Sequence, residues 1–214
     1  MRACYCGELE TIKLLLAAKA NIEAVDNKGR SALMHGAGWY SVEAVELLLA
    51  HKASVNLVGS EGNSALIHAC SVGETFSGCA FEDDEAKFEK VALSLIAAKA
   101  DVSIANAEGE TALLWASAWG LAGAVRALLA AKADVHHTAN NGDTALSRAQ
   151  DNEQEEVAGV LTAHIAQLAE QAKEQARVDA CLARQAAAAA AAATSTAAAT
   201  AAAAAAAASK RKRG

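Results

Sequence analysis

The chain has 214 residues and a formal net charge of −6, and 53% of its residues are hydrophobic, 21% charged and 4% aromatic. Alanine supplies much of the hydrophobic fraction, which suits closely packed helices. Proline is absent, which disfavours a fold of sheets and sharp loops. An acidic chain is also a poor ligand for phosphate backbones, so we expect no nucleic-acid partner.

The first residues and the cysteines indicate an intracellular protein. Glu8, Glu10 and Lys13 interrupt the first twenty positions, so the chain does not open like a secretory signal. The five cysteines lack the paired spacing of a structural zinc site or a secreted disulfide framework; they are Cys4, Cys6, Cys70, Cys79 and Cys181. We expect reduced thiols and a cytoplasmic or nuclear location.

A repeat of about 33 residues organises the chain as far as residue 164. Four copies share one register, and the first 25 residues supply the second half of a further copy. The third copy carries about fourteen extra residues, and the last drifts after its opening; the copies span residues 1–25, 26–58, 59–105, 106–138 and 139–164.

Each copy has the same internal pattern. A turn with glycine at its fourth position, at Gly29, Gly62, Gly109 and Gly142, opens it. A serine or threonine suited to begin a short helix follows, at Ser31, Ser64, Thr111 and Thr144. A second helix with paired leucines comes next. No copy can bury its apolar face alone, so neighbouring copies are predicted to stack.

These features resemble the ankyrin repeat, whose unit is a β-turn and two antiparallel helices. The resemblance covers roughly residues 1–164. It implies an all-α solenoid of stacked helical pairs that binds a protein partner in a concave groove. One departure from the family pattern is that its T-P-L-H start reads SALM, SALI, TALL and TALS in this chain.

A second departure is the lysine that replaces the family's helix-ending glycine, at Lys19, Lys52, Lys99 and Lys132. That glycine normally has a left-handed backbone. A lysine there costs about 1 kcal/mol unless the helix ends differently. We therefore expect a marginally stable array, with the lysines forming a solvated edge rather than a basic binding stripe.

The position before the break between the two helices holds Trp39, Val72, Trp119 and Asn152 in successive copies. We interpret the first three as a partner-contacting row, since tryptophan is enriched at interface hot spots. The alternative is that each tryptophan packs on the neighbouring inner helix. Trp115 falls at a normally buried position and is predicted to lie in the core.

The turn tips are predicted to contact the partner as well. They change from basic at Lys28 and Arg30 to mixed at Glu61 and Asn63. They then become acidic at Glu108 and Glu110, and polar to acidic at Asn141 and Asp143. Such a gradient would orient a partner of opposite polarity. Ordinary solvated turns explain the same residues equally well.

The extra residues of the third copy, at about 75–90, hold all three phenylalanines of the chain, Phe76, Phe81 and Phe88, beside an acidic cluster at 82–85. Two interpretations remain open at this stage. The phenylalanines fold back over the edge of the array, or they form a second contact patch.

No catalytic motif is present, so we expect no enzymatic activity, cofactor or metal. His35 and His68 occupy equivalent positions, and Cys70 follows closely. A metal site or a nucleophile is conceivable there. We instead predict hydrogen bonds between repeats, because both positions face the neighbouring helix and the sequence places no carboxylate to orient an imidazole.

The C-terminal part is predicted to be helical from Glu155 onward, with its first half covering the end of the array. An extension at 165–185 leads to an alanine-rich, low-complexity spacer at 186–208, helical or disordered, that is too weakly apolar to cross a membrane. The basic run Lys210, Arg211, Lys212 and Arg213 resembles a nuclear localisation signal. Four cations are also a common solubilising tail.

The sequence thus predicts a monomeric interaction module or scaffold that binds another protein. The alternative is the substrate-recruiting fragment of a larger signalling enzyme or ubiquitin-ligase subunit.

Overall fold

The computed structural model describes residues 8–71 and 85–211, and describes Glu85 and the residues from 188 onward by their backbone only. The predictions made for Val72, Phe76, Phe81, Lys212 and Arg213 lie outside the described residues, as do those for the side chains of Lys210 and Arg211. The chain divides into two units, Met1–Ile165 and Ala166–Gly214. Each unit is described by itself.

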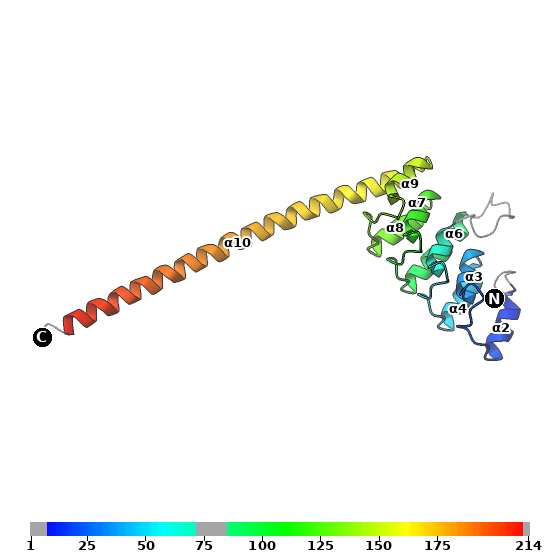
Figure 1. Ribbon diagram of the computed structural model, residues 1–214, viewed down its shortest axis with the longest axis horizontal. Coiled ribbons are helices and arrows are strands. Elements are labelled where there is room, and N and C mark those ends of the chain that lie inside the picture. The colour runs from blue at the N-terminus through cyan, green and yellow to red at the C-terminus, as the bar shows by residue number, and fades with distance from the viewer. Residues whose placement is uncertain (1–7, 72–84, 212–214) are drawn as a thin grey trace. The chain divides into compact units, whose positions relative to one another are not determined.

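The first unit is a stack of antiparallel helical pairs, which confirms the predicted all-α solenoid (Figure 1). The inner layer consists of α3 (Ala32–Gly38), α5 (Ala65–Cys70), α7 (Ala112–Ala118) and α9 (Ala145–Asp151). The outer layer consists of α2 (Leu9–Ala17), α4 (Val42–Ala50), α6 (Glu85–Ala97), α8 (Ala122–Ala130) and the start of α10 (Glu155–Arg211). Helices of successive repeats pack side by side in the inner layer and, from α2 to α8, in the outer layer.

The inner helices depend on their neighbours for stability. They are six or seven residues long, far too short to persist alone in water. All six residues of α5 are buried, and Leu33, Leu66 and Leu113 are buried at equivalent positions of successive repeats. Leu146, at the same position of the last repeat, is only partly buried. The core therefore runs continuously through the stack, as the repeat pattern predicts.

Three of the four predicted helix-opening residues cap their helices. The hydroxyl of Ser31 accepts a hydrogen bond from the Met34 N–H at 3.3 Å. Ser64 caps α5 in the same way, and Thr144 forms a reciprocal capping box with Ser147. Thr111 does not cap α7, and its hydroxyl is buried without a hydrogen-bond partner.

The outer helices end on left-handed lysines. Lys19, Lys52, Lys99 and Lys132 have φ angles of 57°, 63°, 67° and 67°. Around the second of these, the Lys52 N–H donates to Leu49 O at 2.9 Å and the Ala53 N–H donates to Leu48 O at 3.0 Å. This is the hydrogen-bond pattern of a glycine-ended helix. The helices thus end as a glycine would end them, and each lysine retains the backbone strain.

The insertion in the third repeat leads into a longer outer helix. α6 has 13 residues, and Phe88 within it is buried, with its ring edge-on to Tyr40 at a centroid distance of 4.0 Å. Phe88 therefore folds back onto the array, and its assignment to a second contact patch is wrong. The next side chain, Glu89, accepts the Gly123 N–H at 2.6 Å and so caps α8 from the neighbouring repeat.

α10 begins as the last outer helix and continues through both units. Val157 and Leu161 are buried, and Ile165 packs against the same core, so the start of α10 covers the last repeat as expected. In the second unit α10 remains helical through the alanine-rich segment to Arg211, and Leu168 is exposed. Within residues 8–71 and 85–211, no helix has both the length and the apolarity needed to cross a membrane.

The left-handed lysines at the ends of the outer helices predict that a single substitution can raise the stability of the array. Replacing Lys52 by glycine relieves a left-handed non-glycine backbone, so we expect the free energy of unfolding in urea to rise by up to about 1 kcal/mol. The matched control is Glu46→Gly at an exposed interior position of the same helix α4, which should lose about 1 kcal/mol. Equal losses for the two variants would show that Lys52 carries no strain.

Candidate protein-binding surface

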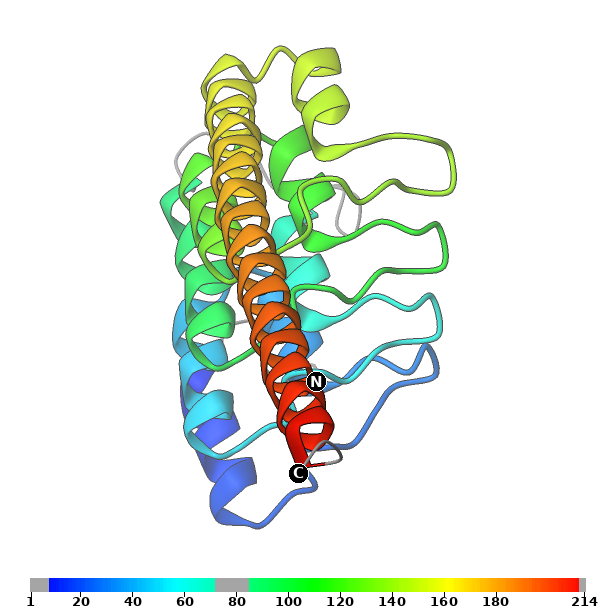
Figure 2. The same cartoon turned by 90° about the vertical axis from the view of Figure 1, so that its left-hand side faces the viewer.

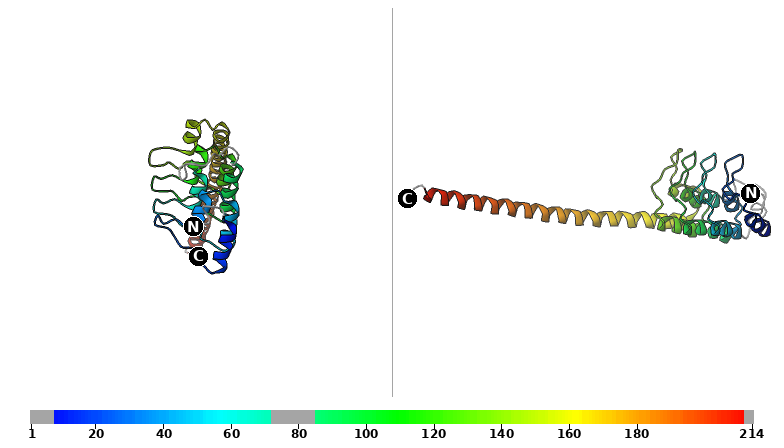
Figure 3. Two further views of the ribbon diagram at one scale, coloured as in Figure 1. Left: turned by 90° about the vertical axis from the view of Figure 1, so that its right-hand side faces the viewer. Right: turned by 90° about the horizontal axis from the view of Figure 1, so that it is seen from below.

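Four hairpin-like turns project from the same side of the helices (Figures 2 and 3). We call them fingers 1 to 4, and an antiparallel bridge closes each one, across residues 25–31, 58–64, 105–111 and 138–144. In finger 1 the Asp26 carboxylate accepts the N–H groups of Lys28 and Arg30, both at 2.9 Å. Asn106 does the same for finger 3. Short polar side chains therefore shape these turns from within.

Backbone hydrogen bonds join each finger to the next. The N–H of Ser60 donates to Lys28 O at 2.9 Å, and that of Ala107 donates to Glu61 O at 2.9 Å. Asn140 N–H donates in the same way to Glu108 O at 3.0 Å. We call this series of bonds the finger ladder. It fixes the spacing of the tips, so a ligand meets a surface that is already ordered.

Two hollows lie between the fingers where they meet the inner helices. The first hollow, between fingers 1 and 2, is lined by Lys28, Arg30, Gly59, Ser60, Glu61, Asn63 and His68. The second hollow, between fingers 2 and 3, has a volume of about 220 Å³ and is lined by Glu61, Asn63, Ile67, His68, Ser71, Asn106, Ala107, Glu108 and Trp115. Glu61, Asn63 and His68 line both hollows, and we call the two hollows together the groove.

The comparisons with known proteins agree with this geometry. The family model described as ankyrin repeats (3 copies) matches residues 1–77 and 84–172. The chain belongs to the ankyrin-repeat family. No individual curated protein matches it significantly. Ankyrin repeats are generally protein–protein interaction modules and are typically non-enzymatic.

One position of the ankyrin array, early in each inner helix, holds His35, His68, Trp115 and Arg148 in turn. The ring Nε2 of His35 lies 3.0 Å from the Asp26 carboxylate of its own finger. The expectation that no carboxylate orients a histidine here is therefore wrong, and the bond lies within one repeat rather than between two. The sequence gives no direct sign of this bond, because Asp26 lies nine positions before His35 and a turn separates them.

Metal binding or catalysis was conceivable at His35 and Cys70, but both residues have the environment of structural residues. Burial lowers the pKa of His35, and the hydrogen bond that its ring donates to Asp26 offsets only part of that effect. Burial raises the pKa of the Cys70 thiol to about 12, which leaves it far from a reactive thiolate. Among the described residues, no group of three or more potential ligands could hold a metal ion.

His68 is the most deeply placed ionisable group of the groove, with only 4% of its surface exposed. Burial, together with the nearby charges of Arg30 and His35, lowers its pKa to about 4. The imidazole is therefore neutral at pH 7, and it faces both hollows as a neutral polar group.

Arg148 forms an ionic cluster at fingers 3 and 4. Its guanidinium lies 2.5 Å from the Glu110 carboxylate and 2.6 Å from that of Asp143. It also lies 5.7 Å from the ring centre of Trp115, which is buried in the core as predicted. Glu110 is only 5% exposed, so its assignment as a tip residue that contacts a partner is wrong.

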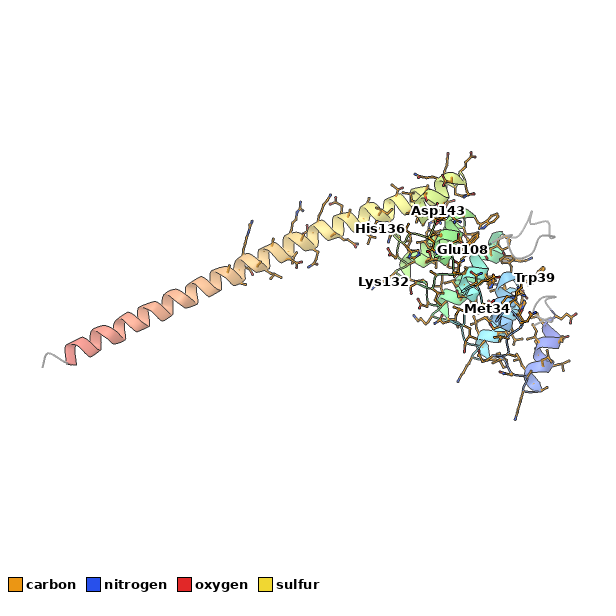
Figure 4. All side chains as sticks on the ribbon, viewed as in Figure 1. Met34, Trp39, Glu108, Lys132, His136 and Asp143 are labelled. Carbon is orange, nitrogen blue, oxygen red and sulfur yellow. The ribbon has the colours of Figure 1, made fainter. Side chains whose placement is uncertain are left out.

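The predicted charge gradient along the tips is therefore reduced. Arg30 is held by Asp26, with nitrogen–oxygen distances of 2.9 and 3.0 Å. Hydrogen bonds from Arg148 and then Asn141 lower the pKa of Asp143. The exposed tip charges without an ion pair among the described side chains are Lys28, Glu61 and Glu108; Glu108 and Asp143 are labelled in Figure 4.

The two tryptophans before the helix breaks have different environments. Trp39 ends α3 and is partly buried (Figure 4), which suits the alternative of packing within the array. Trp119 ends α7 and is 43% exposed. It lies four residues beyond Trp115, and its backbone N–H donates to Trp115 O at 3.1 Å. It therefore shares a helix face with a residue that lines the second hollow.

The setting of His68 predicts an acid-sensitive array. Its pKa falls from 6.5 in the unfolded chain to about 4 in the folded protein, so the unfolded state binds the proton more tightly. The stabilisation is complete above pH 6.5 and is lost as the pH falls toward 4.

We expect the free energy of unfolding to fall by about 2–3 kcal/mol more in the native protein than in His68→Gln between pH 7 and 4.5. Chemical denaturation at several pH values measures this difference. The variant His136→Gln, at an exposed position, is the control and should follow the native curve. Parallel curves for His68→Gln and the native protein would contradict the assignment.

Proposed function

We propose that this ankyrin array is an interaction module that holds an extended segment of a protein partner across its fingers and inner helices. The observation that carries the proposal is Trp119, a large aromatic side chain with 43% of its surface exposed. Leu33, Leu66 and Leu113 already supply the inner-helix core, so the stacking of repeats does not require an exposed indole there. Exposed tryptophan is a common anchor of protein interfaces.

The neighbourhood of Trp119 supports a binding role. Trp115, one helical turn earlier, lines the second hollow. His68 and Asn63, which also line the second hollow, line the first hollow as well. A segment seated on Trp119 would therefore meet a polar groove whose walls are the fingers. An aromatic anchor beside such polar positions is the usual arrangement of a peptide-binding surface.

The finger ladder supports the proposal energetically. Binding sites lose affinity when loops must become ordered on contact. The bonds between Ser60 and Lys28 and between Ala107 and Glu61 order the tips beforehand. The array can then act as a monomeric scaffold, with no step of bond-making chemistry.

The test begins with peptides of twelve residues selected from a random display library on the full-length protein. Their dissociation constants are then measured for the native chain and for Trp119→Ala. We expect the variant to bind about thirtyfold more weakly, since an aromatic anchor contributes about 2 kcal/mol or more. Its melting temperature should stay close to that of the native chain, because the indole is partly solvated.

Leu93→Ala is the matched control. Leu93 is also 43% exposed but lies on the outer helix α6, so its removal should leave peptide affinity unchanged. If Trp119→Ala and Leu93→Ala bind every selected peptide as the native protein does, Trp119 is not the anchor and the proposed function is wrong.

A further inference from the structure

We propose that His68 is the group by which the groove recognises an uncharged amide of the bound segment, through hydrogen bonds made by its ring nitrogens. This inference rests on the proposed function and names the chemistry that the partner must present. His68 belongs to the inner helix α5, and it lines both the first hollow and the second hollow. The amide is either a main-chain peptide group or the side chain of an asparagine or glutamine.

The ring of His68 is buried without a hydrogen-bond partner. Only 4% of the residue is exposed, and it is the carbonyl of His68, not the ring, that accepts the Ser71 hydroxyl at 3.4 Å. Among the described residues, no hydrogen bond reaches either ring nitrogen, and burial and nearby charges alone shift the ring's pKa. The buried polar atoms that are both unpartnered and sealed from solvent belong to other side chains, such as Asn63 and Trp115. The His68 nitrogens therefore keep surface that a ligand atom can reach.

Finger 2 lacks the carboxylate that binds the equivalent histidine of finger 1. The ring Nε2 of His35 lies 3.0 Å from the Asp26 carboxylate, and the position of Asp26 is taken by Gly59 in finger 2. Both fingers have the same backbone bond here, in which this position donates its N–H to the carbonyl four residues later at 3.0 Å. The array thus satisfies one histidine internally and leaves the other open to the groove.

The protonation state of His68 defines what a ligand must bring. Burial lowers the pKa of the ring to about 4, so the imidazole is neutral at pH 7. A neutral imidazole carries one N–H donor and one bare acceptor nitrogen. Complete hydrogen bonding therefore requires both an acceptor and a donor from the ligand. Amides supply both, as C=O and N–H, and an extended segment presents such groups at every residue along the groove.

Other ligand groups fit this position less well. A carboxylate can only accept and an ammonium can only donate, so each leaves one ring nitrogen unpaired. An apolar side chain would cover the ring and leave both nitrogens unpaired. Charge alone selects neither sign at His68, because the charged residues that line the two hollows are Lys28, Arg30, Glu61 and Glu108.

The test uses the twelve-residue peptides selected on the full-length protein. In a selected peptide, each main-chain amide is replaced in turn by an ester, which removes the N–H donor and weakens the carbonyl acceptor. Each asparagine is replaced by leucine and each glutamine by methionine. We expect at least one replacement to weaken binding to the native protein about tenfold, as the loss of a hydrogen bond in a buried site would. A sensitive ester identifies a main-chain amide, and a sensitive side-chain replacement identifies a side-chain amide.

Variants of His68 locate the effect. Phenylalanine has a ring without nitrogen, so the sensitive replacement should cost nothing when His68→Phe is the receptor. His68→Gln keeps a donor and an acceptor and should restore much of the tenfold preference. The matched control His136→Phe changes an exposed histidine that lines neither hollow, and it should bind both peptides as the native protein does.

A second pair of variants leaves His68 in place. Gly59→Asp puts a carboxylate where finger 1 has Asp26, so the ring of His68 gains a partner within the array and the amide preference should disappear. Gly59→Ala is the matched control. It adds the same Cβ atom, 3.3 Å from Lys28 O, without the carboxylate, and it should keep the preference.

The outcomes separate the two proposals. If Trp119→Ala weakens binding but the sensitive replacement costs as much in His68→Phe as in the native protein, His68 recognises no amide and the proposed function stands. The same conclusion follows if no replacement is sensitive, or if Gly59→Asp keeps the preference as Gly59→Ala does. If binding ignores Trp119, the proposed function itself is wrong. A selection that yields no binding peptide contradicts both.

Discussion

The finger ladder is the contact on which the rest of the structure depends. Each rung joins an N–H of one finger to a carbonyl of the finger before it, as from Ala107 to Glu61. These bonds require a close approach of two backbones, and the array provides it at a left-handed glycine. At Gly62, a Cβ atom would lie 3.0 Å from Asn106 Cα. The ladder sets the spacing of the inner helices, and the spacing in turn creates the hollows.

Electrostatic pairing inside the fingers determines which charges remain for a partner. At one end Asp26 holds Arg30 and His35, and at the other Arg148 joins Glu110 to Asp143. Both clusters use charges that a sequence count assigns to the surface. Between them, Glu61 and Glu108 of fingers 2 and 3 form no ion pair with any described side chain. In the proposed binding groove, the charges left for a partner are those that the array does not neutralise internally.

Local features could be predicted well from the sequence because they depend on neighbouring residues. The capping serines Ser31 and Ser64, the stacked helical pairs and the core position of Trp115 all follow from a pattern within one repeat. The lysine ends show a limit of this reasoning. The sequence reveals that Lys52 stands where the family has glycine, but only the backbone angle of 63° shows that the helix keeps the same ending.

Contacts across repeats could not be predicted in the same way. The burial of Glu110 depends on Arg148, 38 residues later, and Phe88 is buried because Tyr40 of the preceding repeat receives its ring. Each side chain looks like a surface residue within its own segment, since a charge at a turn tip and an aromatic beside an acidic run are usually solvated. The second hollow also arises only when two fingers are placed side by side. The one sequence signal that points toward the second hollow is a set of equivalent positions in successive repeats, which holds His35, His68, Trp115 and Arg148.

Two glycine substitutions test the finger ladder most directly. Gly62 and Gly142 both have a left-handed backbone, with φ angles of 79° and 92°, so alanine strains both turns. Only Gly62 faces the next finger, whereas a Cβ at Gly142 would meet nothing within 4 Å. The account predicts that Gly62→Ala lowers the free energy of unfolding by about 1–3 kcal/mol more than Gly142→Ala does, as overpacking typically costs. Equal losses for the two variants would contradict it.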